Sequence, residues 1–202
     1  GSQADSHGLF AHTEPLDEAN DLESEVFARA GYQTYIWDDH TIATSALGFA
    51  QGVAPRRVRQ SLLTAADPTF THILERVQRE PGFRAYLGTS FTVTHGAYGL
   101  DRVEPFCERH PRACGGLPAR EILRWGELYH AHRLALERNY DETVRRLGLS
   151  ARERERLSAA IEAIYASRIE YLDELFGGIV SAIDGAGLSD EALVVFTADH
   201  GE

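Results

Sequence analysis

The stretch that decides the expected fold is LVVFTADHGE, residues 193–202. Residues 193–196 form an unbroken apolar run after turn-forming residues, which is typical of a strand buried on both faces of a parallel sheet. Asp199 and His200 follow it at the carboxyl end, where open α/β sheets bind ligands. The pattern therefore predicts an α/β fold with its chemistry at this edge.

Asp199 and His200 have the side chains of a metal-binding pair. A carboxylate and a neutral imidazole suit Zn²⁺ or Mn²⁺, and Gly201 allows the backbone to turn tightly around an ion. The alternative is that Asp199 caps a helix and His200 lies on the surface. Spacing alone leaves both interpretations open.

The longer block YASRIEYLDELFGGIVSAIDGAGLSDEALVVFTADHGE, residues 165–202, resembles the sulfatase family of the alkaline phosphatase superfamily. In that family a helix leads through Gly and Asp into a strand that ends in Asp-His-Gly-Glu. The resemblance implies a partial alkaline-phosphatase-like α/β/α sandwich with a mostly parallel sheet. It also implies that Asp199 and His200 bind a divalent metal ion, which we expect to be Zn, Mn or Ca and to be held weakly by the isolated chain.

A second similarity lies near the other end, in LESEVFARAGYQTYIW, residues 22–37. Asn20 with Glu23 is a candidate capping box, and an apolar stripe predicts a helix that Gly31 stops. Residues 32–37 are rich in β-formers and predict a strand. This order resembles the sulfatase segment that follows the catalytic nucleophile.

Asp38, Asp39 and His40 end that strand and could form a hard-metal cluster. In the sulfatase family, however, the metal-binding Asp pair ends the first strand, before the nucleophile. We therefore interpret Asp38 and Asp39 as loop residues or a cap, with the metal cluster as the alternative.

A third strand is predicted over residues 83–93, with a bulge or close backbone approach at Gly88. It runs into Thr94-His95-Gly96-Ala97-Tyr98, which resembles the sulfatase strand followed by His-x-Pro-Tyr, with Ala97 in place of Pro. The resemblance implies a catalytic His95 that contacts the sulfate or phosphate group. The alternative is that His95 only caps the strand end by hydrogen bonding.

The remaining patterns predict mainly helices. Asp67 and Pro68 begin one, residues 118–140 form another, and Ser150 caps the longest, which extends to Ile183. Val58, Leu62 and Leu63 suggest a short helix. Residues 99–117 are expected to be a long loop, in which Cys107 and Cys114 form a disulfide, stay as free thiols, or join His110 in a metal site.

Composition limits the classes of function. The 202 residues, 43% of them hydrophobic, predict a single partial domain over 1–202, in which Gly1-Ser2 is typical of a tag remnant. The formal net charge of −11 argues against a nucleic-acid partner. No stretch approaches the roughly 20 apolar residues of a membrane span. The native compartment stays open.

The sulfatase resemblance also sets an expectation for activity. The family nucleophile lies in a Cys- or Ser-x-Pro-Ser-Arg motif, which this sequence lacks. We therefore expect an inactive internal fragment of a metal-dependent sulfuric ester hydrolase acting on sulfate or phosphate esters. The alternatives are a phosphodiesterase or phosphoglycerol transferase of the same superfamily, or a non-catalytic α/β binding module. An exposed sheet edge would favour a homodimer.

Overall fold

The computed structural model describes residues 16, 21–39, 48, 50–95 and 98–198. Its chain divides into two compact units. The sheet unit comprises residues 1–92 and 175–201, and the helical unit comprises residues 93–174 and 202. The long helix α7 (Ala151–Gly185) contributes to both.

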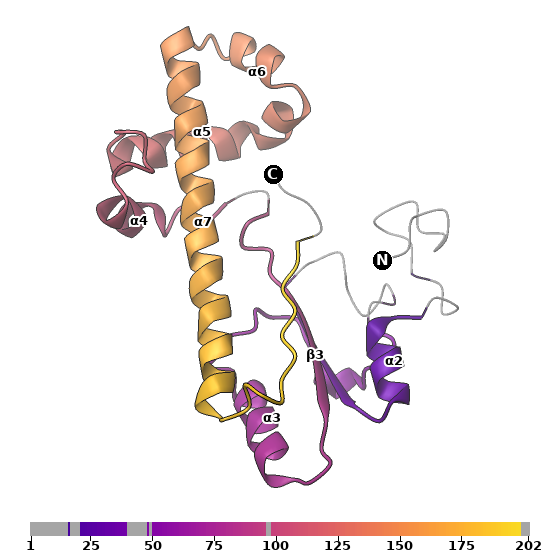
Figure 1. Ribbon diagram of the computed structural model, residues 1–202. Helices are drawn as coiled ribbons and strands as arrows, with labels where there is room; N and C mark the ends of the chain where they lie inside the picture. The colour runs from indigo at the N-terminus through magenta and orange to yellow at the C-terminus, as the bar shows by residue number, and fades with distance from the viewer. Residues whose placement is uncertain (1–15, 17–20, 40–47, 49, 96–97, 199–202) are drawn as a thin grey trace. The chain divides into compact units, whose positions relative to one another are not determined.

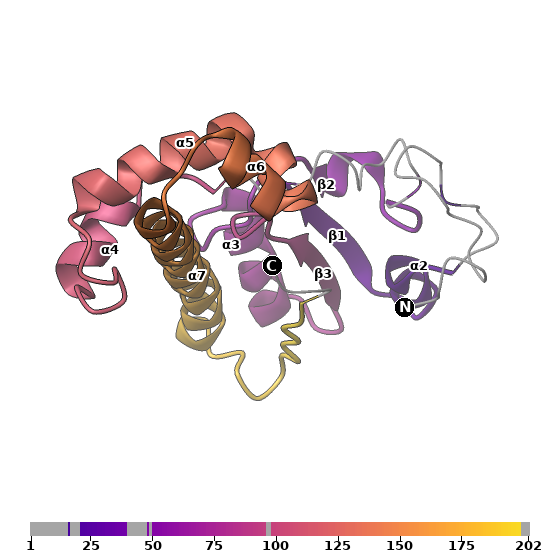
Figure 2. The same cartoon turned by 90° about the horizontal axis from the view of Figure 1, so that it is seen from above.

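The sheet unit contains three parallel strands, β1 (Gln33–Asp38), β2 (Val58–Arg59) and β3 (Ala85–Ser90), in the order β2-β1-β3. Figure 2 shows β1 between its two neighbours. The predicted α/β class and parallel strands are confirmed at this level. The short helix predicted around Val58 is wrong, because Val58 pairs with Ile36 after a 3-10 turn, η2 (Pro55–Arg57).

Helices pack on both faces of this sheet (Figure 1). On one face, α3 (Pro68–Arg79) and the end of α7 bury Trp37 of β1. On the other, Phe27 of α2 (Glu23–Arg29) stacks on Tyr86 of β3, with ring centroids 4.5 Å apart. Side chains alternate between faces along a strand, so each helix layer meets a different set of residues.

Local signals for helix ends are mostly confirmed. The Asp67 carboxylate accepts hydrogen bonds from the backbone N–H groups of Thr69 and Phe70, which caps α3 as predicted. Gly31, with φ of 84°, follows α2. Asn20 lies outside the described residues, and the N-cap position of α2 is Leu22, whose backbone N–H donates to Glu25.

Gly88 does not mark a bulge. The β1–β3 register runs without interruption through the pair of Ile36 and Gly88. A Cβ atom added to Gly88 would come no closer than 3.5 Å to a neighbour, the Tyr86 hydroxyl, which is ordinary contact. The expectation of a bulge or close approach at Gly88 is therefore wrong.

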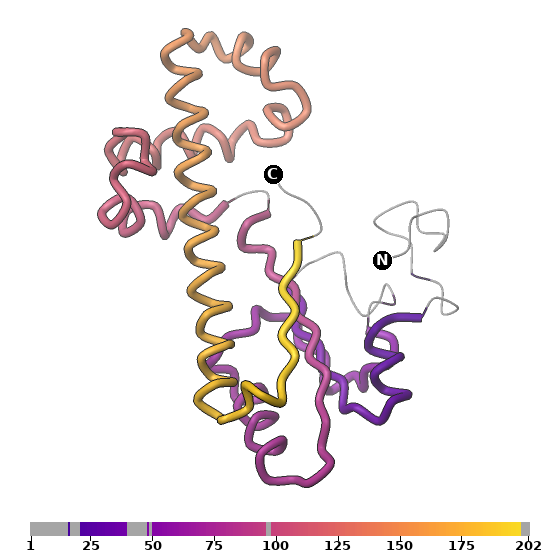
Figure 3. The backbone as a smooth tube through the Cα atoms, in the orientation of Figure 1, coloured from indigo at the N-terminus to yellow at the C-terminus, as the bar shows by residue number. Residues whose placement is uncertain are grey.

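The apolar run Leu193–Phe196 is not a buried strand, which corrects the central sequence prediction for this segment. After α7 the chain turns at Gly187 and then continues without regular secondary structure through residues 192–198 (Figure 3). Leu193 is 89% exposed and Val195 75% exposed. Phe196, the last residue of the run, packs against Phe176 of α7, with ring centroids 4.8 Å apart. Apolar sequence predicts burial only where other elements cover both faces.

The helical unit is built from α4 (Val103–Arg109), α5 (Ala119–Arg138), α6 (Tyr140–Arg146) and the first part of α7. Ser150 and Glu153 exchange hydrogen bonds before α7 as a capping box, which confirms the predicted helix start. Residues 99–117, expected to be a long loop, contain α4. Among the described helices, none combines the length and apolar character needed to cross a membrane.

Cys107 and Cys114 form a disulfide, so the first of the three alternatives for this pair is confirmed. The Cys107-His110-Cys114 metal site is wrong, because both sulfur atoms are bonded to each other. Cys114 is buried in the core of the helical unit. The disulfide thus ties the turn after α4, at Cys114, to α4 itself, at Cys107.

Candidate functional site

The carboxyl edge of the sheet carries a buried acid. Asp38 is the last residue of the central strand β1 and only 8% exposed. The hydroxyl of Ser90, the last residue of β3, donates a 2.7 Å hydrogen bond to the Asp38 carboxylate. Interpreting Asp38 as a loop residue was therefore wrong: it lies in the ladder opposite Ser90. A buried carboxylate needs such donors to offset its lost hydration.

Asp39 has a different role. Its carboxylate accepts the backbone N–H of Thr92, at 3.1 Å from Oδ1, where the chain leaves β3. Asp39 lies outside regular secondary structure just after β1, so the predicted loop residue is confirmed for Asp39. His40 lies outside the described residues. Within the ranges that the structure describes, no three or more His, Cys, Asp and Glu side chains gather in a way that could hold a metal ion.

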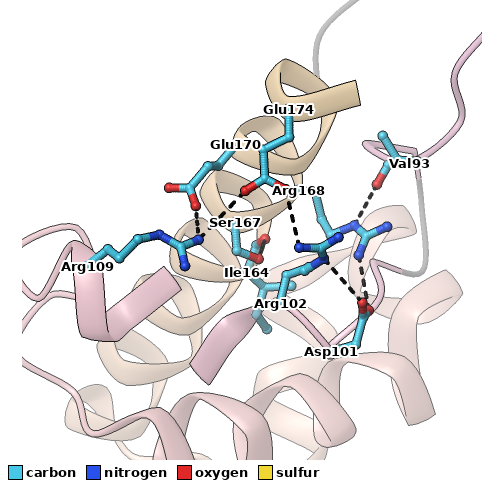
Figure 4. A network of polar contacts seen from close by, with 9 residues as sticks. All are labelled: Val93, Asp101, Arg102, Arg109, Ile164, Ser167, Arg168, Glu170 and Glu174. Carbon is cyan, nitrogen blue, oxygen red and sulfur yellow. Dashed lines mark hydrogen bonds and ion pairs between the residues drawn. The ribbon is translucent and has the colours of Figure 1, made fainter. Parts of the chain in front are cut away.

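His95 belongs to the helical unit and stands in an exposed bend that follows β3. His95 follows the strand as predicted, but the strand ends at Ser90 rather than at residue 93. The catalytic role of His95 stays a prediction. Arg168 of α7 reaches the chain just before it: the Arg168 Nε donates to the Val93 carbonyl at 3.0 Å. Figure 4 shows this contact and the ion pair between Arg168 and Asp101.

Around Arg168, charged residues of α7 pair with arginines at the two ends of α4 (Figure 4). Arg102 pairs with Glu174, and Arg109 pairs with both Glu170 and Glu174. The Arg109 guanidinium, hydrogen-bonded to Glu170, holds the pKa of the Glu170 carboxyl below its usual value. The His110 ring, 2.6 Å from Glu170, acts in the same direction.

The sequence contains a signal for Arg168, although its hydrophobic pattern alone did not predict the residue's role. Arg168 lies four residues after Ile164, on the apolar face of α7 that packs against the core. An arginine at a core-facing position has to find partners for its guanidinium. Those partners, Val93 and Asp101, are distant in sequence, so only the structure identifies them.

Asp199 and His200 lie outside the described residues, so their metal-binding role stays a prediction. The structure describes the chain that leads to them, from the end of α7 through residues 192–198, which have no regular secondary structure. Protein-family models, curated proteins and solved structures were compared with this chain, and no match was found.

Proposed function

We propose that this chain is part of a metal-dependent sulfuric ester hydrolase of the sulfatase type, with a partial alkaline-phosphatase-like α/β/α sandwich. The observation that carries the proposal is the order of elements around its motifs. β3 is followed, after residues 91–93, by Thr94-His95, and α7 leads through a glycine turn into the segment before Asp199-His200. The parallel sheet with helices on both faces supports the same proposal.

In this proposal His95 binds the ester oxygens or protonates the leaving group, and Asp199 and His200 hold a divalent ion. A carboxylate with an imidazole is a fitting donor set for Zn²⁺ or Mn²⁺. Such an ion neutralises developing charge on the ester oxygens. The family nucleophile motif is absent from the sequence, so these residues supply binding and orientation rather than a complete reaction.

Two alternatives remain as proposals beside it. A phosphodiesterase or phosphoglycerol transferase of the same superfamily would use the same metal pair on a phosphate ester. A non-catalytic α/β binding module is favoured by one observation, the missing nucleophile motif. Binding of an oxyanion at His95 separates the hydrolase proposals from a module that binds through another surface.

The proposed function can be tested on this chain by NMR titration with metal ions and oxyanions. Mn²⁺ or Zn²⁺ is expected to shift the NMR signals of His200, and sulfate or tungstate those of His95. His200→Ala removes the metal response, while His72→Ala, on the exposed face of α3, leaves it unchanged. Turnover of aryl sulfate and aryl phosphate stays at background, because no nucleophile motif is present.

Two results would contradict this proposal in different ways. No response of His200 to either metal ion would remove the metal pair. Robust turnover of an aryl ester that is lost in His200→Ala would keep the metal pair but overturn the expectation of an inactive chain.

We also propose the homodimer expected from the sequence, with its contact at the exposed apolar segment Leu193–Phe196 rather than at a sheet edge, because this segment is not a strand of the sheet. This segment is apolar and exposed, and it follows the sheet unit's last helix. An exposed apolar segment can be covered by a second copy of the chain, and such a contact is self-complementary under two-fold symmetry. The absence of charge in residues 192–198 keeps the like charges of two acidic chains out of the contact.

The dimer is tested by sedimentation velocity over a range of protein concentrations. Val195→Glu is expected to shift the chain to monomer, because it places like charges in the contact. Leu134→Glu is the matched control, since Leu134 is a similarly exposed apolar residue on α5. A wild-type chain that stays monomeric at the highest concentration would refute the dimer.

A further inference from the structure

Arg168 is a buried cation that contacts the chain on both sides of His95. Its side chain is only 9% exposed. Its Nε donates to the carbonyl of Val93 at 3.0 Å, and its Nη1 donates to Asp101 Oδ1 at 3.1 Å (Figure 4). One planar guanidinium therefore bonds the positions before and after residues 94–100.

Gly99 provides a second, independent indication that the chain is fitted to this guanidinium. A Cβ atom added to Gly99 would lie 2.6 Å from Asp101 Oδ1 and 2.9 Å from Arg168 Nη1. Both distances are too short for an ordinary contact. The backbone at residue 99 thus passes so close to the ion pair that only glycine fits without a shift of the pair.

The guanidinium of Arg168 is also held in orientation from its own helix. Its Cζ lies 4.9 Å from the centre of the Tyr171 ring, and the Cζ of Arg102 lies 4.1 Å from the same centre. Arg102 in turn pairs with Glu174 and lies 3.7 Å from Asp101 Oδ2. A guanidinium stacked on a ring and hydrogen-bonded at its edge has little rotational freedom.

From this geometry we infer that Arg168 is the positioning residue for His95: it fixes both ends of residues 94–100 on α7 and so limits where the imidazole can lie. Arg168 acts through the backbone of Val93 and the side chain of Asp101, and contacts no reacting atom. The consequence for ester binding rests on the proposed function, whereas the restraint on the His95 segment does not.

The test compares Arg168→Lys with Arg102→Lys. Lysine at 168 keeps the charge but lacks the planar fork that reaches Val93 and Asp101 together. Arg102 shares Asp101 and Tyr171 but is more exposed and makes no bond to Val93, so Arg102→Lys is the matched control. NMR order parameters of the Thr94, His95 and Tyr98 amides are measured, with tungstate titrated while the His95 ring signals are followed.

In Arg168→Lys, the order parameters of these amides should fall from the rigid range near 0.85 to below about 0.6, with the helix amides of α5 unchanged. The apparent tungstate affinity at His95 should weaken about tenfold, because a loosened group is no longer preorganised. Arg102→Lys should change neither quantity appreciably.

The outcomes separate the inference from the proposed function. If Arg168→Lys loosens the segment but tungstate never shifts His95 in the wild-type chain, the positioning role stands and the proposed function fails. If Arg168→Lys leaves the order parameters at their wild-type values, the positioning role is overturned, whatever tungstate does. Should Arg168→Lys fail to fold, Asp101→Ala removes the acceptor after residue 100 from an exposed side chain, and unchanged order parameters there would also overturn the positioning role.

Discussion

Replacing Trp37 with alanine is expected to lower the free energy of unfolding of the sheet unit by about 3–5 kcal/mol. Trp37 is fully buried in the central strand and packs in a cluster with Phe70 and Ile73 of α3 and Ile179 of α7. Its indole Nε1 also donates to Asp67 Oδ2 at 3.1 Å. The loss would be a large part of the total for a domain whose stability is about 5–15 kcal/mol.

Two variants make this prediction specific. Trp37→Phe keeps an aromatic ring but loses the indole donor, so we expect a smaller loss, of about 1–2 kcal/mol. The N-terminal cap of α3 should remain in this variant, because the Thr69 and Phe70 N–H groups donate to Asp67 Oδ1 rather than to Oδ2. Val26→Ala, at an exposed position of α2, should change little. Urea denaturation followed by far-UV circular dichroism gives the midpoints, and a loss below about 1 kcal/mol for Trp37→Ala would contradict the packing argument.

Features set by neighbouring residues could be predicted from the sequence. The Asp67 carboxylate satisfies the first N–H groups of α3, and Ser150 satisfies one at the start of α7. Gly31 supplies a left-handed residue after α2. Each is a short-range effect, so the local sequence contains all the participants. The parallel sheet was expected from the sulfatase resemblance and from the apolar run at residues 193–196, although that run is not itself a strand.

Features set by distant residues could not be predicted. The apolar run Leu193–Phe196 resembled a buried strand, but burial depends on which elements cover it. Val58 became a strand residue only because Ile36 lies beside it. The Asp38–Ser90 bond and the contacts of Arg168 join residues far apart in sequence. A pattern can mark such a side chain as unusual, but it cannot name the partner.

The disulfide is expected to stabilise the helical unit. Reducing Cys107–Cys114, or replacing both residues with alanine, is expected to lower the free energy of unfolding of the helical unit. The two residues are seven positions apart. For a loop this short, the chain-entropy relation gives about 2.5 kcal/mol. Urea denaturation of the helical unit with and without a reductant measures it, with hydrogen exchange of the α4 amides as the local probe.

The same experiment distinguishes covalent from metal cross-linking. A chelator should leave the unfolding of the oxidised chain unchanged, because the two sulfur atoms are bonded to each other rather than to an ion.

Cys107→Ala and Cys114→Ala break the same bond, but Cys114 is only 1% exposed, so Cys114→Ala should lose more stability by leaving a cavity. Loosening of the turn after α4 would also weaken the contacts of Arg109 and His110 with Glu170, and the pKa of the Glu170 carboxyl should then rise toward its usual value. If the reduced and oxidised chains unfold at the same urea concentration, the disulfide does not stabilise this unit.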